Sequence, residues 1–563
     1  MQMNGRRALD DGPLFYLALY LTFLVVALFV YAPSLSGDFV SDDNHYVLHN
    51  RYVRNPNLAN LTAILDPTGV PAKLVENYAP VHLLLNAVEW QLFGREVQGY
   101  HIVNVSIHAL ASLLLVMFFR RYRVSLLAAL LAGGLFLLHP ANVEAVAWIS
   151  QLKTGTSLAL CVGALLVQSR RPALGAALFA LALFAKPTAA VALSTLALST
   201  WFEKTRRNRA PDSQESRGGA GSWGWVGVWL IIFIVFAVAE FWAFNKTAGQ
   251  APVFYEDPWV RMRSTCAISL RYIVMALSGR GLSTFHEPPA ADSLFDAWWL
   301  GSLVVLALLA YRMIVTLMRQ DDEAIFWVWA AGSFAPISGL IPLPYPLADR
   351  YLYFILPGLM GGMLLAGPPL ARQFSSALGL PLAPERARQA VALLCLVVMY
   401  QFATAARERS LVWLNNETMM ADAELHYPSG LPAQTRIAHR AAAQGDADAA
   451  VVALRAANRR GYNRLDHLLS DPAYDGIRSD PGFQKLLREI AQSWLDGYLL
   501  LEEPSQEELQ TIAQAYIVLD ELPQAIDAVE RALELEGPLT GELRQNLEDL
   551  RRAQRIRESV RPR

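Results

Sequence analysis

Three carboxylates lie close together in the chain, directly after the first long apolar segment and before a polar loop. They belong to Asp38, Asp42 and Asp43. Like charges raise each other's pKa and apolar surroundings raise it further, so such a cluster at a membrane edge is costly and is typical of catalysis or ion binding. The alternative is structural, because Asp and Asn are favoured at helix N-termini and could cap a short helix over His45–Leu48. The segment alone does not decide between the two.

Basic residues occur at three other points of the chain. The membrane topology described below places them on the same side as the three carboxylates. Arg350 follows a proline-rich stretch at the start of an apolar run, and Arg is the side chain best suited to bind a phosphate through two parallel hydrogen bonds. Lys153 and Lys186 border apolar segments, where a lysine can meet an anion or a carboxylate. The structural alternatives are an exposed Asp349–Arg350 pair of little energetic weight and a Lys186 side chain that reaches the lipid headgroups. For Lys186 considered by itself we favour the second.

Polar side chains also interrupt the apolar segments. His101, Asn104 and His108 recur at intervals of three and four, which places them on one helix face that should point into a helix bundle. For these three we favour hydrogen bonding between helices over catalysis. His139 precedes a proline, which ends a helix at a membrane edge, and Glu144 lies just beyond it.

The composition indicates a membrane portion joined to a soluble portion. Of 563 residues, 54% are hydrophobic and 17% charged, which is too apolar for an ordinary soluble protein and too mixed for a purely membrane-embedded one. The net charge of -2 gives no concentration of Lys and Arg to displace the counterions of a phosphate backbone, so no nucleic-acid partner is expected. The three cysteines lie in apolar segments and do not form a disulfide framework.

Twelve apolar runs are long enough, or nearly so, to cross a bilayer, for which about 20 residues are needed. They cover 14–33, 99–119, 124–138, 152–168, 172–184, 187–202, 223–244, 263–279, 297–318, 325–341, 351–367 and 388–405. Lys and Arg concentrate in cytoplasmic loops, and this rule is satisfied if the N-terminus is inside and about 11 of the runs cross. The run 263–279 carries Arg271 in its middle, and we expect it to be short, re-entrant or interfacial. The extracytoplasmic side would then hold the large loop 34–98, the 342–350 loop and the C-terminal portion.

Two further segments complete the domain organisation. Residues 204–222, rich in Ser, Gly and basic residues, are typical of a flexible cytoplasmic linker within a membrane domain that covers 1–405. The composition then changes, and 406–563 is predicted to be a soluble helical domain. Within it, segments 431–463 and 506–539 fit a helix-turn-helix repeat of about 34 residues. Repeats of this kind bind extended peptides or partner proteins, and some are only spacers.

In order and spacing, these segments resemble the transmembrane and tetratricopeptide-repeat protein O-mannosyltransferases and their bacterial relatives, which belong to the GT-C class of polytopic glycosyltransferases. The resemblance covers nearly the whole chain. It rests on Gly37–Val40 with Asp42 and Asp43, Tyr78 with Pro80, Gly99–His101 with Asn104 and His108, His139–Ile149, Lys186, Ala348–Tyr353 and the repeats. It implies an all-α fold, namely a polytopic membrane helix bundle of GT-C type followed by a soluble tetratricopeptide-like helical domain.

The resemblance also implies a reaction. The donor would be a polyprenyl phosphate carrying one sugar, a hexose such as mannose, and the acceptor a protein hydroxyl on the extracytoplasmic face, with inversion at the anomeric carbon. Asp42 or Asp43 would take the hydroxyl proton, and Arg350, Lys153 and Lys186 would bind the donor phosphate. Supporting roles are expected for Asp38, His139, Glu144, His101, Asp349 and Tyr353. A divalent cation, Mg or Mn, could bridge the phosphate and Asp42, although no ligand spacing diagnoses one.

We therefore expect a multi-pass protein of the inner (cytoplasmic) membrane, with the repeat domain in the periplasm or otherwise outside the cytoplasm, where it would hold the protein acceptor. Two other functions fit the same sequence. A transferase of the same class could modify a glycan or a lipid. A membrane-anchored repeat scaffold or transporter would need a polar path through several spans, whereas the polar residues here cluster near the outer half of the bundle. Because the phosphate-binding candidates share that side, we favour catalysis for Asp42 or Asp43.

Overall fold

The computed structural model describes residues 12–75, 77–209, 222–244, 257–338, 345–377, 384–498, 504, 506–535 and 539–560. It divides into two compact units, Met1–Asp422 and Ala423–Arg563. The described residues form helices and no strand, which confirms the predicted all-α class. Residues 406–422, assigned to the soluble domain from composition, pack with the first unit. Of the predicted linker, residues 210–221 lie outside the described residues, as do Pro342 and Pro344.

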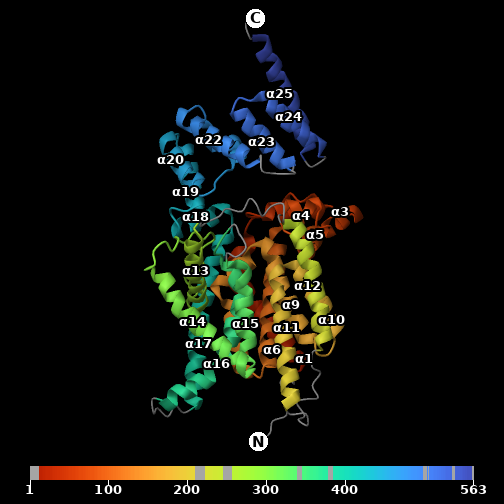
Figure 1. Ribbon diagram of the computed structural model, residues 1–563, viewed down its shortest axis with the longest axis vertical. Coiled ribbons are helices and arrows are strands. Elements are labelled where there is room, and N and C mark those ends of the chain that lie inside the picture. Colours follow the sequence, from red (N-terminus) through yellow and green to blue (C-terminus); the bar gives the residue numbers. More distant parts are fainter. Residues whose placement is uncertain are drawn as a thin grey trace. The chain divides into compact units, whose positions relative to one another are not determined.

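The first unit is a helix bundle in which most long helices run side by side (Figure 1). Its helices are α1 (Pro13–Tyr31), α2 (Arg51–Arg54), α3 (Leu58–Leu65), α4 (Val70–Leu74), α5 (Pro80–Phe93), α6 (Val97–Arg121), α7 (Leu126–Leu138), α8 (Val143–Ala147), α9 (Leu152–Val167), α10 (Pro172–Ala185), α11 (Val191–Arg209), α12 (Trp223–Phe244), α13 (Pro258–Ser278), α14 (Ala297–Arg319), α15 (Glu323–Phe334), α16 (Leu352–Ala377), α17 (Pro384–Ser410) and α18 (Asn416–His426). Each of the predicted apolar runs falls on one of them.

Seven of these helices are long and apolar enough to span a membrane: α1, α6, α9, α12, α14, α16 and α17. An eighth is added if α7 and the segment Pro140–Ala147, bent by 51° relative to each other, form one broken span. The bend follows His139, where the sequence predicts that a helix ends before proline. The other predicted runs fall on α10, α11, α13 and α15, which are shorter or more polar. The chain is therefore polytopic, and the number of crossings, about 11, stays a prediction.

Helix α13 is bonded near its start to the 280–296 loop and near its end to His139. Near its start, Arg263 donates to the carbonyl of Ala291, at 2.8 Å, in the 280–296 loop. Near its end, the carbonyl of Ala276 lies 3.0 Å from His139 Nε2. Ser283, in the same loop as Ala291, also reaches Asp349 at 3.4 Å. Helix α13 has 21 residues and is therefore not short, and whether segment 263–279 crosses the bilayer stays a prediction.

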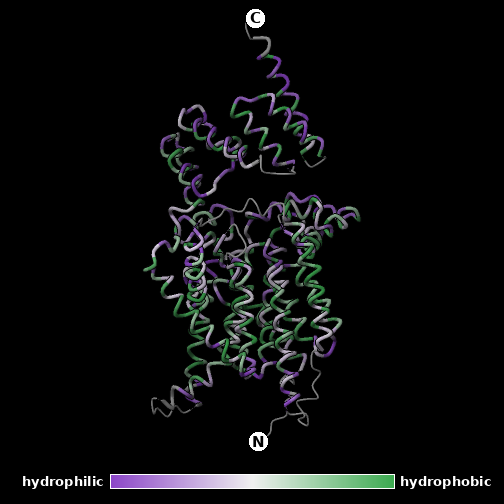
Figure 2. Tube along the Cα trace, in the orientation of Figure 1, coloured by the Kyte–Doolittle hydropathy of each residue, from purple (hydrophilic) through white to green (hydrophobic). Residues whose placement is uncertain are grey.

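Packing within the bundle relies on small residues where helices approach closely. A Cβ added to Gly358 on α16 would lie 2.5 Å from the backbone nitrogen of Ala330 on α15, so only glycine fits there. On the outside, α1, α12, α14 and α17 expose large apolar side chains such as Val25, Ile231 and Val304. Figure 2 shows the helices of the first unit as mostly hydrophobic, whereas those of the second unit alternate in polarity. The outer face of the bundle therefore suits lipid rather than water.

The second unit consists of α19 (Leu431–Ala443), α20 (Ala447–Asn458), α21 (Leu465–Ser470), α22 (Pro481–Tyr498), α23 (Gln506–Val518), α24 (Leu522–Glu534) and α25 (Thr540–Val560). Both predicted repeat segments contain a pair of helices, α19 with α20 and α23 with α24. The small residues at their predicted packing positions are buried: Ala438, Ala450, Ala457, Ala513, Ala525 and Ala532. Their assignment as tetratricopeptide repeats stays a prediction.

Candidate active site

Asp43 is a buried carboxylate that fixes the loop after α1. It is 0% exposed. Its Oδ2 accepts a hydrogen bond from the backbone N–H of Val40 at 2.9 Å, and its Oδ1 accepts from the backbone N–H of Ser150 at 2.8 Å and from the Ser150 hydroxyl. Burial raises the pKa of Asp43 to about 7, and these hydrogen bonds oppose the shift because they favour the charged form. Asp43 therefore holds this loop against the segment that precedes α9.

Asp42 lies in the same loop but is partly exposed. Among the described residues, its carboxylate accepts one hydrogen bond, from the Ser41 hydroxyl at 3.3 Å. Ser41 has a positive φ of 50°, a turn conformation that non-glycine residues seldom adopt. Its backbone N–H is held by the side chain of Asn416 at 3.0 Å. The turn thus leaves Asp42 as the carboxylate of the pair that a substrate can reach.

Arg350 pairs with Glu144 rather than with its neighbour Asp349. The backbone N–H of Arg350 donates to Glu144 Oε2 at 2.7 Å, and its guanidinium group bonds to Glu144 Oε1. The Arg350 side chain is 16% exposed, and that of Glu144 is 1% exposed. Asp349 is fully buried and points to other partners, so the exposed Asp349–Arg350 pair considered from sequence does not form. The guanidinium is close enough to Asp42 for the Asp42 charge to act on it.

The two predicted lysines lie near Arg350. Lys153 Nζ donates to the Tyr46 hydroxyl at 2.8 Å and lies 4.2 Å from the centre of the Tyr46 ring. Lys186 Nζ donates to Thr154 Oγ1 at 2.7 Å, so this side chain is directed at α9 rather than toward lipid headgroups. The charges of Lys153, Arg350 and Glu144 all act on Lys186. Three basic side chains from separate parts of the chain thus lie near one another, and Arg350 is the one that contacts Glu144.

Several of the predicted supporting residues hold helices together. The Nδ1 of His108 lies 2.8 Å from the Tyr353 hydroxyl, and Asn104 donates to the carbonyl of Trp148 at 3.1 Å. His139 contacts α13, as described above, and the Nδ1 of its ring accepts from the backbone N–H of Ala141. His101 is buried on the same helix as Asn104 and His108, whereas the Asp38 side chain is exposed. These contacts agree with the packing interpretation of the polar stripe on α6.

A part of the chain matches curated proteins. Over 128 residues it is 35% identical to protein O-mannosyl-transferase Tmtc1 of Drosophila melanogaster, covering 22% of this chain and 15% of that protein. Over 143 residues it is 29% identical to protein O-mannosyl-transferase TMTC4 of Homo sapiens, covering 22% of this chain and 19% of that protein. This chain resembles the protein O-mannosyl-transferases. The matches thus span less than a fifth of these relatives' length.

These matches confirm the predicted resemblance for that part of the chain. No family model matches the sequence. No solved structure matches it either. The resemblance of the remaining segments therefore rests on the motifs described from the sequence.

Two residues of the site, Tyr46 and Trp148, were not recognised from the sequence as functional candidates. Tyr46 follows Asp42 by one helical turn, a spacing that could have marked it. Trp148 donates to the carbonyl of Val40 at 3.3 Å, and its ring lies 5.5 Å from the Arg350 guanidinium carbon. Glu240 is a lone acid in the apolar run 223–244, a sequence signal of a weak candidate, and it accepts from the backbone N–H of Tyr78 at 3.2 Å.

The residues around Asp42 offer little to a metal ion. In the part of the chain that the structure describes, no group of three or more His, Cys, Asp and Glu side chains is placed to hold one. Both carboxylate oxygens of Asp43 already accept hydrogen bonds, from Val40 and Ser150. A divalent cation bridging Asp42 and a donor phosphate stays a prediction.

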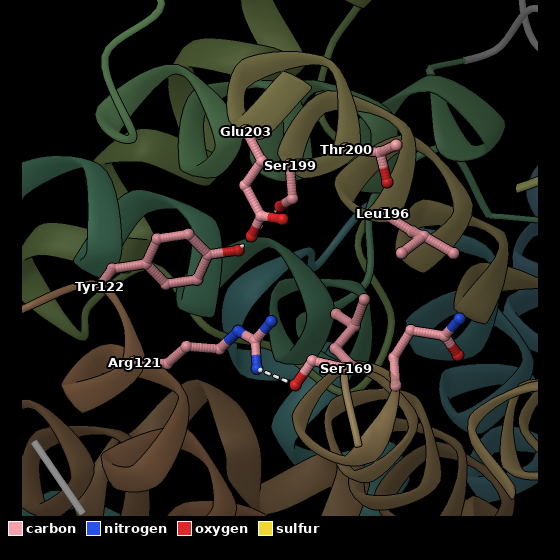
Figure 3. A pocket seen from close by; sticks show the side chains of 9 residues that line it. Arg121, Tyr122, Ser169, Leu196, Ser199, Thr200 and Glu203 are labelled. Atoms are coloured by element: carbon pink, nitrogen blue, oxygen red, sulfur yellow. Dashed lines mark hydrogen bonds between the residues drawn. The ribbon is translucent and has the colours of Figure 1, made fainter. Parts of the chain in front are cut away.

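A small polar pocket lies at the other end of α6 and α9. It is lined by Arg121 at the end of α6 and Tyr122 directly after it, by Ser169 after α9, and by Ser199 and Glu203 on α11. The Tyr122 hydroxyl lies 3.1 Å from Ser199 Oγ, and Figure 3 shows the Tyr122 and Glu203 side chains pointing toward each other. Because Trp148 and Lys153 lie near the opposite end of α9, this pocket is separate from the candidate active site.

Proposed function

We propose that this protein is an integral membrane glycosyltransferase that moves one hexose, such as mannose, from a polyprenyl-phosphate donor to a protein hydroxyl on the extracytoplasmic face. The observation that carries the proposal is the partly exposed Asp42 carboxylate near Arg350, with Lys153 and Lys186 in the same part of the bundle. The names of the matched relatives support transfer of mannose to protein oxygen. They cover too little of either chain to identify the donor or the acceptor.

In the proposed reaction, the acceptor hydroxyl attacks the anomeric carbon from the side opposite the phosphate. Asp42 takes the hydroxyl proton, the new carbon–oxygen bond forms, and the bond from the anomeric carbon to the phosphate oxygen breaks, which inverts the centre. Negative charge then collects on the departing polyprenyl phosphate. Cations that are already in place lower the barrier because they need no reorganisation as that charge develops.

Each cation has a support that keeps it in place for this role. Glu144 binds both the backbone and the guanidinium of Arg350, and Tyr46 and Thr154 bind Lys153 and Lys186. Asp43 supports Asp42 indirectly, by fixing the loop that carries it. In this assignment Asp42 is the base, which separates the two carboxylates that the sequence left equivalent.

The acceptor is proposed to be a protein, with the helical second unit as its binding module, and the membrane is proposed to be the cytoplasmic membrane. The chain leaves the last long helix, α17, near the loop that carries Asp42: Asp38 N–H donates to the carbonyl of Leu414 at 2.7 Å. This contact supports placing the residues that follow α17 on the extracytoplasmic side. A glycan or lipid acceptor is the second candidate. A scaffold or transporter is less well supported, because Asp42, Arg350, Lys153 and Lys186 belong to one end of the bundle and form no polar path through it.

Intact-mass analysis of extracytoplasmic proteins tests the proposal. Cells carrying the wild type should contain proteins with added hexose, and cells carrying Asp42→Asn should lack them at equal levels of the membrane protein. Hexose found on lipid or glycan instead would favour the second candidate. Identical protein masses in the two strains, together with unmodified lipids and glycans, would contradict the proposal.

A further inference from the structure

A buried network of charged groups lies directly behind Arg350, and the proposed reaction does not use it. Asp349 precedes Arg350 in a short 3-10 helix, Asp349–Tyr351 (η9), and is 0% exposed. Its Oδ1 lies 2.7 Å from His286 Nε2, and its Oδ2 lies 2.9 Å from an Arg409 guanidinium nitrogen. Arg409 also lies 3.2 Å from Asp422 Oδ1. One carboxylate thereby joins η9 to the 280–296 loop and to the end of α17.

A second layer of hydrogen bonds closes the network on the α18 side. Asp422 Oδ2 accepts from the backbone N–H of Thr284 at 2.9 Å, and the Thr284 hydroxyl donates to the carbonyl of Met419 at 2.8 Å. The Arg409 and Asp422 side chains are only 10% and 7% exposed. Removing Arg409 would leave two buried carboxylates without their shared cation, and buried charges are costly without a partner.

The network determines where Arg350 can be. Helix η9 has three residues and is held from both sides, by the Asp349 carboxylate in this network and by the bond from Arg350 N–H to Glu144. If Asp349 loses Arg409, one of these two attachments weakens. The guanidinium of Arg350 would then shift relative to Glu144, Lys153 and Lys186. A phosphate-binding group that is displaced by a fraction of its contact distance contributes much less to binding and catalysis.

We infer that Arg409 is a positioning residue for Arg350, acting through Asp349 to hold the guanidinium where it meets the donor phosphate. This inference rests on the proposed function. Because Arg409 also pairs with Asp422 on α18, the placement of Arg350 is tied to the segment that continues into the second unit.

Donor kinetics of the purified full-length protein test the inference. Transfer from mannosyl-phosphoryl polyprenol is measured as KM and kcat, with donor Kd and the thermal midpoint alongside, for wild type, Arg409→Ala and Arg409→Lys. The matched control is Arg312→Ala, which removes the bidentate pair of Arg312 with Glu323 at 2.7 and 2.6 Å between α14 and α15. We expect Arg409→Ala to raise donor KM and to lower kcat/KM by about 100-fold, the cost of displacing a group by ~1 Å. Arg409→Lys should recover part of the loss, and Arg312→Ala should lower the midpoint without changing KM.

Asp422→Asn provides a second variant that loosens Arg409 while leaving Asp349 its cation. A raised KM in Asp422→Asn supports the inference even if Arg409→Ala does not fold. Unchanged donor KM and Kd in Asp422→Asn and Arg409→Ala, with lower midpoints alone, would overturn it. Equal increases in KM in Arg312→Ala would overturn it as well, because the effect would then follow destabilisation. A wild-type protein that transfers no sugar would contradict the proposed function. The ratio of donor Kd between Arg409→Ala and wild type would then still decide the role of Arg409.

Discussion

The Asp43 carboxylate and Ser150 join two segments that lie 107 residues apart in the chain. Asp43 Oδ1 accepts from the backbone N–H of Ser150 at 2.8 Å and from its hydroxyl, while Oδ2 accepts from Val40. All of these bonds are buried. They place the loop that carries Asp42 beside Trp148 and the start of α9, where Lys153 lies.

Ser150→Ala should destabilise the protein by about 1–2 kcal/mol, since it removes one donor to a buried carboxylate and leaves the backbone donors in place. The measurement is the thermal midpoint of the detergent-solubilised protein. Ser41→Ala is the control, because it removes a hydroxyl from the partly exposed Asp42 and should shift the midpoint less. Equal midpoints for the two variants would show that the bond between Asp43 and Ser150 contributes little.

The contribution of Asp43 to stability should fall as the pH rises from about 4 to about 7. Burial raises the pKa of Asp43 from 3.8 to about 7, so the folded state binds more protons than the unfolded state between these two values. Stability then decreases with rising pH across that window and levels off above about 7. Burial also raises the pKa of Glu89, to about 8, so Glu89 shifts stability in the same direction. The measurement is the difference in thermal midpoint between wild type and Asp43→Asn. This difference should depend on pH. A constant difference from pH 5 to 8 would contradict the contribution assigned to Asp43.

Lys186→Met should raise the donor concentration needed for half-maximal transfer by about tenfold, because a charge-assisted contact to the phosphate is lost. Arg121→Met is the control: it removes a cation from the pocket at the far end of the bundle, where no donor phosphate is proposed to bind. Initial rates against donor concentration provide the measurement. The same KM in both variants and in wild type would remove Lys186 from the phosphate site.

Glu144 and Arg350 should act as one unit. Arg350→Gln weakens donor binding directly, and Glu144→Gln should weaken it because the guanidinium loses the partner that orients it. A double-mutant cycle on donor Kd should give a coupling of about 1–3 kcal/mol, with the double variant little worse than Arg350→Gln. Strictly additive effects would mean that Glu144 does not act through Arg350.

Composition and periodicity were sufficient to predict the helices but not the pairings between them. Every predicted apolar run falls on a helix, because a long apolar stretch in lipid satisfies its backbone only by forming one. The bend after His139 was also predictable, since proline constrains the residue before it. These are local properties of the chain, so a single sequence contains them.

The partners of the charged residues could not be predicted from local sequence patterns. Arg350 and Glu144 lie 206 residues apart, and Asp349 meets Arg409 rather than its neighbour in the chain. Such pairs depend on how helices are placed in space. The different surroundings of Asp42 and Asp43 likewise follow from the contact with Ser150, which no local pattern indicates.

The most direct test of the central claim is the initial rate of hexose transfer by purified Asp42→Asn protein. The donor is radiolabelled mannosyl-phosphoryl polyprenol, and the acceptor is the extracytoplasmic protein fraction of cells that lack this protein. Loss of the general base should lower the rate by about 10²–10⁴-fold while donor Kd and thermal midpoint stay at their wild-type values. A wild-type transfer rate in Asp42→Asn would contradict the assignment of Asp42 as the base.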